Sequence, residues 1–90
     1  MPYIIPADRK QFDPAIEELV DAITNHGFSK VKAGDLNYTF SKILWGLFKK
    51  NPSYTLGNEF MGMLECVKQE FYRRQLAPYE DEKIKEHGDL

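Results

Sequence analysis

Apolar residues recur with helical spacing in three stretches of the chain. The first stretch opens with Asp13, which can cap a helix, and Pro14, which suits a first helical turn. Its apolar positions then follow the i, i+3, i+4, i+7 pattern of one helix face: Ile16, Leu19, Val20 and Ile23. The pattern predicts an amphipathic helix that begins near Asp13 and ends at Gly27.

The second stretch predicts a helix from Asp35 to about Lys50, where the following Asn51-Pro52 pair stops it. One face collects most of its apolar residues: Leu36, Phe40, Ile43, Leu44, Leu47 and Phe48. Tyr38 and Trp45 lie on another face. A helix with apolar or aromatic groups on two faces usually contacts two layers. In a chain of 90 residues we expect the second layer to be another subunit.

The third and longest predicted helix runs from about Tyr54 or Thr55 to Ala77. Its apolar positions recur at a spacing close to that of a heptad repeat: Leu56, Phe60, Met63, Leu64, Val67, Phe71 and Leu76. Gly57 and Gly62 each weaken the helix by about 1 kcal/mol relative to alanine, which favours close packing at those points. Pro78 is expected to interrupt the helix. The charged residues 79–90 then predict a short solvated helical tail that ends near Gly88.

Residues 1–12 carry prolines at positions 2 and 6 and are therefore expected to form an extended arm. Three apolar residues let this arm dock on another surface: Tyr3, Ile4 and Ile5. Phe28–Val31 is the only strand candidate and is too short to build a sheet. The sequence therefore predicts one all-α domain over residues 1–90, with a helical core at 13–78. Its long third helix is expected to assemble into a homo-oligomer.

Composition excludes several classes of protein. A net charge of −2 and a pI near 5.6 argue against a general nucleic-acid coat, although residues 30–50 carry a net charge of +4. No apolar run approaches the roughly 20 residues of a membrane helix, and no signal peptide is recognised. A single cysteine, Cys66, cannot form an internal disulfide and fits a cytoplasmic protein. On the long helix it is expected to be a packed thiol.

No complete catalytic or metal-binding set is found. The glycine-rich phosphate loops are absent, and His26 and His87 have no histidine or cysteine neighbour at metal-ligand spacing. Glu18 and Asp21 form half of a paired acidic motif of the kind that holds magnesium, but the second helix adds only Asp35. We therefore expect neither a resident cofactor nor a metal. Magnesium-dependent nucleotide hydrolysis ranks third among the functions considered.

Two polar stretches could bind a small anionic ligand. One lies at a helix N-terminus, where backbone N–H groups favour anions: Asn37, Tyr38 and Thr39. The other lies near the end of the long helix: Lys68, Tyr72, Arg73 and Arg74. The arginines can hold phosphate and the tyrosines can stack on a base. The structural alternative is an arginine pair bridged to Glu70 or to the acidic tail. Because successive residues turn by about 100°, only part of this cluster can converge on one ligand unless two subunits contribute.

Over nearly all of its length the chain resembles a family of short helical proteins found in bacteria, archaea and their viruses. The resemblance rests on several segments: Pro2-Tyr3-Ile4 with Pro6, Leu36-Asn37-Tyr38, Glu65-Cys66-Val67-Lys68, Glu70-Phe71-Tyr72-Arg73-Arg74, Ala77-Pro78-Tyr79-Glu80-Asp81 and Lys83-Ile84. It implies a compact helical protein and brings no established activity.

A shorter segment is similar to viral sponge proteins, which sequester cyclic-nucleotide or cyclic ADP-ribose immune signals. Their long C-terminal helix ends in an arginine, four residues, then proline and an acid, which here correspond to Arg73, Pro78 and Glu80. Tyr79 intervenes between Pro78 and Glu80, where those proteins join proline and acid directly. The similarity implies a helical oligomer, with Arg73 as the only matched ligand contact.

These observations lead to two main hypotheses. In the first, the protein is a non-catalytic sponge that holds a cyclic nucleotide or an ADP-ribose derivative at subunit interfaces. In the second, it is an adaptor or inhibitor that binds another protein and no small ligand. Its hot-spot candidates are then large aromatic residues: Tyr38, Trp45 and Tyr54. A nucleotide stabilises a sponge in proportion to its concentration and leaves an adaptor unaffected.

Overall fold

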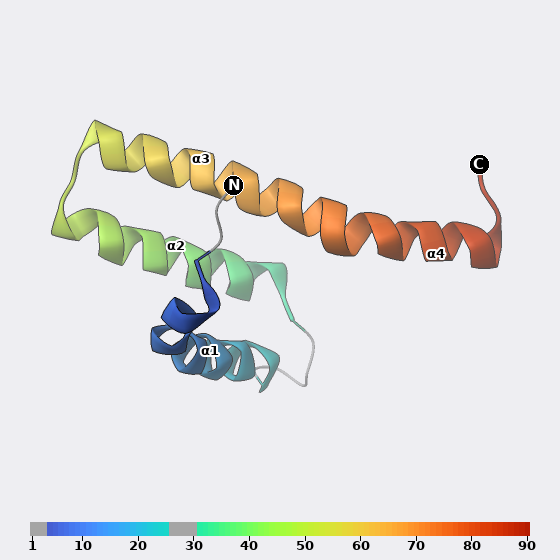
Figure 1. Ribbon diagram of the computed structural model, residues 1–90, viewed down its shortest axis with the longest axis horizontal. Coiled ribbons are helices and arrows are strands. Elements are labelled where there is room, and N and C mark those ends of the chain that lie inside the picture. The colour runs from blue at the N-terminus through green and yellow to red at the C-terminus, as the bar shows by residue number, and fades with distance from the viewer. Residues whose placement is uncertain (1–3, 26–30) are drawn as a thin grey trace. The chain divides into compact units, whose positions relative to one another are not determined.

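The computed structural model describes residues 4–25 and 31–90. Every regular element in these ranges is helical, which confirms the predicted all-α class. The order along the chain is η1 (Pro6–Gln11), α1 (Asp13–Asn25), α2 (Ala33–Lys50), α3 (Tyr54–Phe71), η2 (Tyr72–Leu76) and α4 (Ala77–His87) (Figure 1). The chain divides into two units, Met1–Lys50 and Asn51–Leu90, and each is described by itself.

The expectation of an extended arm is wrong for Pro6–Gln11, which forms the 3₁₀ helix η1. The Asp8 N–H donates to the Ile5 carbonyl over 2.9 Å, and the Arg9 Nε donates to the Ile4 carbonyl over 3.1 Å. Pro6 favours this helix start because its fixed φ suits a helix and its missing N–H would have had no partner there. Pro2 and Tyr3 lie outside the described residues.

Helix α1 begins at Asp13, as predicted. The Ile16 N–H donates to the Phe12 carbonyl over 3.0 Å, so Phe12 precedes the first helical turn and Asp13 lies inside it. The expected end at Gly27 lies outside the described residues, as do His26 and most of the Phe28–Val31 segment.

Helix α2 begins at Ala33, two residues before the predicted start at Asp35, and ends at Lys50 as predicted. The short break that follows ends at Ser53, whose hydroxyl accepts a hydrogen bond of 3.0 Å from the Leu56 N–H. This N-cap satisfies one of the donors that a helix start leaves unbonded, and it places the first residue of α3 at Tyr54.

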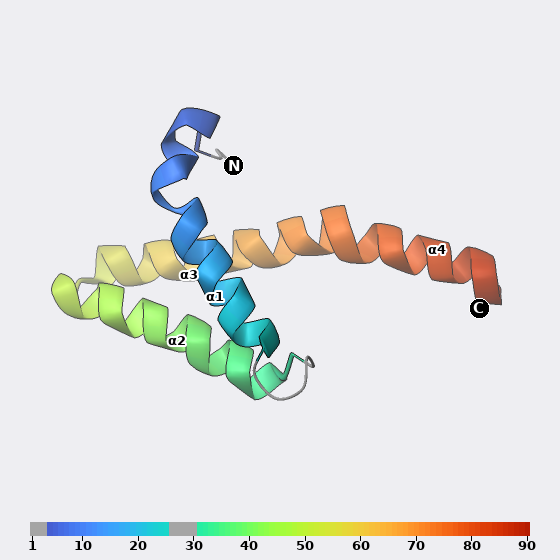
Figure 2. The ribbon, with the colours of Figure 1, turned by 90° about the horizontal axis from the view of Figure 1, so that it is seen from below.

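The helix in the unit Asn51–Leu90 does not stop at Pro78, which corrects the predicted interruption. α3 passes through η2, a π-helical segment, directly into α4, and the ribbon is continuous in two perpendicular views (Figures 1 and 2). The Ala77 N–H donates to the carbonyl of Tyr72, five residues back. Proline has no N–H for the carbonyl four residues earlier and its ring clashes with that group. The wider π turn accommodates Pro78 without ending the helix.

The predicted charged tail is helical and ends near Gly88, as expected. Gly88 has a φ of +86°, and its N–H donates to the Ile84 carbonyl over 2.8 Å. Residues 54–87 therefore form one uninterrupted helix, which we call the long helix. No other described element belongs to this unit.

No described residue is buried. Leu19, Ile23, Leu36 and Leu44 are half-buried in the unit Met1–Lys50, where side chains of α1 and α2 line one pocket. A Cβ built on Gly62 meets no heavy atom within 4 Å, so nothing in the described structure packs closely there, contrary to the expectation for this glycine. Large apolar side chains thus remain available for contacts beyond their own unit.

Candidate functional site

Three of the predicted ligand residues line one depression on the long helix. Lys68, Tyr72 and Arg73 surround a volume of about 600 Å³ beside η2. The rest of the lining comes from the same helix: Glu65, Gln69, Glu70, Phe71 and Leu76. Because one helix supplies every lining residue, the depression is a shallow surface feature, and a second surface is needed to enclose a ligand.

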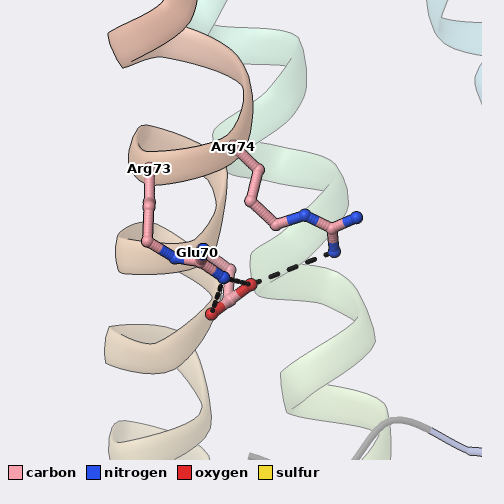
Figure 3. A network of polar contacts seen from close by, with 3 residues as sticks. All are labelled: Glu70, Arg73 and Arg74. Atoms are coloured by element: carbon pink, nitrogen blue, oxygen red, sulfur yellow. Dashed lines mark hydrogen bonds and ion pairs between the residues drawn. The ribbon is translucent and has the colours of Figure 1, made fainter.

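The cations in and beside this depression form ion pairs, and Figure 3 shows those of Arg73 and Arg74 with Glu70. Nη2 of Arg73 lies 3.1 and 3.0 Å from the two carboxylate oxygens of Glu70. Arg74 Nη1 lies 4.0 Å from the same carboxylate. Lys68 Nζ lies 3.7 Å from Glu65 Oε1. The structural alternative, an arginine pair bridged to Glu70, is therefore confirmed as the arrangement of these side chains.

The charge balance limits what the depression can do alone. Among the lining residues, Lys68 and Arg73 are cationic and Glu65 and Glu70 are anionic, so the formal charges cancel. A phosphate that binds Arg73 must share or displace Glu70. Exposed pairs of this kind are weak, so displacement is possible but no strong anion site is preformed.

The other predicted ligand residues belong to α2, in the unit Met1–Lys50. The Thr39 hydroxyl donates to the Asp35 carbonyl over 2.7 Å, and the Asn37 Oδ1 accepts from the Ser41 hydroxyl over 3.3 Å. Tyr38 and Thr39 line a pocket of about 300 Å³. The remaining lining residues are Leu19, Ala22, Ile23 and Asp35. Neither unit by itself brings these residues together with Lys68, Tyr72, Arg73 and Arg74.

This α1–α2 pocket is poorly suited to a phosphate. The Oδ2 atom of Asp35 is buried and has no hydrogen-bond partner among the described groups. An uncompensated carboxylate oxygen repels an anion at short range. Asn37 Oδ1 and the Thr39 hydroxyl are already hydrogen-bonded within α2. The pocket therefore offers few polar groups that would recognise a nucleotide.

Sequence reasoning placed Tyr38 and Trp45 on a separate face of α2 but missed two lysines beside them. Lys42 and Lys49 complete an i, i+4, i+7, i+11 series with the two aromatic residues, and at 100° per residue all four lie within about 60°. Tyr38 is 66% exposed and Trp45 is 65% exposed. We call these four residues the aromatic–basic face. Their spacing was the signal that could have identified the lysines.

The remaining candidates offer no catalytic or metal-binding arrangement in the described part of the chain. No group of three or more histidine, cysteine, aspartate or glutamate residues in residues 4–25 and 31–90 could hold a metal ion. Cys66 is exposed, which corrects the expectation of a packed thiol: it lies beside the helix face that carries Met63, Leu64 and Val67 and not on it. None of the described helices is both long and apolar enough to span a bilayer.

A family model described as a domain of unknown function (DUF6899) matches residues 1–90. The chain therefore belongs to that family. No curated protein and no solved structure matches it.

Proposed function

We propose that this member of the DUF6899 family is a non-catalytic adaptor or inhibitor that binds an acidic surface of another protein through its aromatic–basic face. The observation that carries the proposal is the exposure of Tyr38 and Trp45 on the same face of α2, with Lys42 and Lys49 in line. Large aromatic side chains dominate the binding energy of protein interfaces. Their exposure here supplies two anchors about 10 Å apart along the helix axis.

The lysines give this face its specificity. Lys42 and Lys49 are exposed, and no acidic residue of α2 lies in their part of the helix, since Asp35 is in its first turn. Peripheral charges of one sign accelerate association with a surface of the opposite sign and make the binding salt-dependent. An acidic protein surface can pair with the two lysines, while its apolar atoms pack against the two aromatic side chains. The net charge of −2 disfavours the competing choice of a nucleic acid.

Trp45 provides the test because it is the only tryptophan in the chain. Proteins captured by the wild type and lost with Trp45→Ala are identified, purified and titrated while the Trp45 emission is recorded. We expect a shift of that emission and at least a 30-fold weaker affinity for Trp45→Ala, the loss typical of an interface hot spot. Raising the salt concentration should slow association.

Tyr54→Ala is the matched control. Tyr54, the third hot-spot candidate from the sequence, is 95% exposed but begins α3 and is not one of the four residues of the aromatic–basic face. We expect its affinity to stay within twofold of the wild type. A purified partner that binds Trp45→Ala as tightly as the wild type contradicts the proposal. So does a tightly bound single-stranded nucleic acid that shifts the Trp45 emission in place of a protein.

The depression beside η2 supports a second candidate function, sequestration of a small anionic nucleotide. The observation that favours it is the clustering of Lys68, Tyr72 and Arg73 around one depression next to a π segment, a feature frequent at functional sites. Arg73 would hold phosphate and Tyr72 would stack on a base, with a second subunit completing the enclosure. The exposed Cys66 fits the reducing cytoplasm in which such signals occur.

Native mass spectrometry with cyclic dinucleotides, cyclic trinucleotides and ADP-ribose derivatives tests this second candidate. A sponge retains the intact nucleotide, and Arg73→Ala loses it. A spectrum without bound ligand across the panel contradicts sequestration and leaves the adaptor as the remaining proposal.

A further inference from the structure

We infer that the apolar stripe of the long helix pairs with the same stripe of a second copy, with the two helices antiparallel. The stripe consists of Leu56, Phe60, Met63, Leu64, Val67 and Phe71. At 100° per residue these six side chains lie within about 100° of one another, so they form a single face. No other described element of the unit Asn51–Leu90 is available to cover them.

The stripe exposes apolar area that an interface between two copies would cover. Met63, Leu64, Val67 and Phe71 are 39–60% exposed, whereas Leu56 and Phe60 are half-buried. At about 150–200 Å² for a large side chain, the uncovered apolar area of these four residues is roughly 300–400 Å². A standard interface uses about 800 Å² per partner, of which about 65% is apolar between identical subunits. These four residues therefore supply more than half of the roughly 500 Å² of apolar area that one half of such an interface uses.

The spacing of the stripe identifies the occupant as a second copy. The intervals between successive apolar positions are four, three, one, three and four residues, so the pattern is the same from either end. A two-fold axis that is perpendicular to the helix and passes through the midpoint of the stripe, between Met63 and Leu64, maps this pattern onto itself. A self-complementary patch of this kind is what a symmetric dimer requires, whereas an unrelated partner needs no such symmetry.

Side-chain sizes favour the antiparallel arrangement. The two-fold axis places Phe60 opposite Val67 of the second copy, Leu56 opposite Phe71 of the second copy, and Met63 opposite Leu64 of the second copy. Each phenylalanine then faces a smaller side chain. In a parallel pair, Phe60 and Phe71 would each face the same phenylalanine of the second copy, and Val67 would face Val67. The interface would then be overpacked at the phenylalanines and underpacked at the valines.

The polar end of the long helix agrees with this register. Pairing centred between residues 63 and 64 joins residues 56–71 and leaves α4 outside the paired segment. The charged residues of α4 pair among themselves, with Lys83 Nζ 3.2 Å from Glu86 Oε2 and Lys85 Nζ 3.4 Å from Glu82 Oε1. This part of the helix presents few apolar groups and needs no apolar partner.

Sedimentation equilibrium of the full chain gives the first test. We expect a mass twice the 10.5 kDa of one chain at micromolar concentration. Val67→Glu should weaken the dimer at least 100-fold because it buries an unpaired charge at the centre of the stripe. Gln69→Glu adds the same charge on the opposite face of the helix and should change the dissociation constant by less than threefold. A helical wild-type monomer at these concentrations overturns the inference.

Disulfide trapping tests the orientation without disturbing the fold. In a Cys66→Ser background, Leu64→Cys lies close to the two-fold axis and should give a covalent dimer on oxidation. Leu56→Cys should not, because residues 56 of antiparallel copies are about 22 Å apart along the axis. A covalent dimer from both variants indicates a parallel pair and overturns the antiparallel arrangement. Neither result depends on Trp45, so the adaptor proposal is tested separately.

Discussion

The guanidinium of Arg73 engages both carboxylate oxygens of Glu70 across one turn of the long helix, at 3.1 and 3.0 Å from Nη2 (Figure 3). Arg73 is largely exposed, so the pair adds little to the free energy of unfolding. Its effect is electrostatic. Glu70 also pairs with Arg74, so one carboxylate reduces the positive potential of two arginines. Whether the depression beside η2 accepts an anion therefore depends on Glu70 as much as on the arginines.

Replacing Glu70 by glutamine should strengthen any binding of a cyclic dinucleotide to this depression. Removing one negative charge near the phosphate position is worth about 1 kcal/mol at an exposed site, or five- to tenfold in affinity. Isothermal titration of wild type, Glu70→Gln and the control Glu59→Gln measures the effect. Glu59 belongs to the same helix but does not line the depression. Equal affinities for Glu70→Gln and wild type would contradict the idea that Glu70 limits anion binding at this depression.

Ser53→Ala should destabilise the protein by about 1 kcal/mol, because it removes the hydroxyl that accepts the Leu56 N–H at the start of α3. Urea unfolding at a fixed protein concentration measures the loss. Ser41→Ala is the control: its hydroxyl donates to Asn37 in the middle of α2, where alanine is the better helix former. A Ser53→Ala protein as stable as Ser41→Ala would mean that the cap is not formed in solution.

Gly62→Ala should stabilise the protein by about 1 kcal/mol, since the new methyl group meets nothing within 4 Å and alanine favours the helix. The opposite sign is expected for Gly88→Ala, which costs about 1 kcal/mol because φ is +86° there. Urea unfolding of both variants and of the wild type measures the two changes in the free energy of unfolding. A destabilised Gly62→Ala protein would instead indicate that a partner packs closely against this glycine.

Pro78→Ala should convert η2 into regular α-helix, because alanine carries the backbone N–H that proline lacks and removes the ring that clashes with the carbonyl four residues earlier. We expect the amide protons of residues 72–78 to exchange more slowly and the stability to rise by about 1–3 kcal/mol. Pro14→Ala is the control, since Pro14 lies in the first turn of α1, where its N–H would have no helical partner. Unchanged exchange near residue 76 would mean that the π turn has another cause.

Local signals predicted the helices and several of their ends. The Asn51-Pro52 pair stops α2 at Lys50 as expected, and Gly88 ends α4 as expected. These ends depend on backbone chemistry within a few residues, which any sequence displays directly. Pro78 was misjudged because its cost can be relieved by widening one turn, and Pro6 because its φ suits a 3₁₀ helix as well as an extended arm.

For the candidate sites, too, some properties follow from the residue types and others depend on the folded structure. Residue types alone indicated that Arg73 can hold a phosphate and that Trp45 can anchor a partner. Only the folded chain decided that Glu70 pairs with Arg73, that Cys66 is exposed and that the Asp35 carboxylate lies in the α1–α2 pocket. The helix pattern, in contrast, could be predicted from the sequence, including the near-heptad series of apolar positions that begins at Leu56. The physical reason is range: helix formation and capping act over three or four residues, whereas pairing and exposure depend on which side chains the fold brings together.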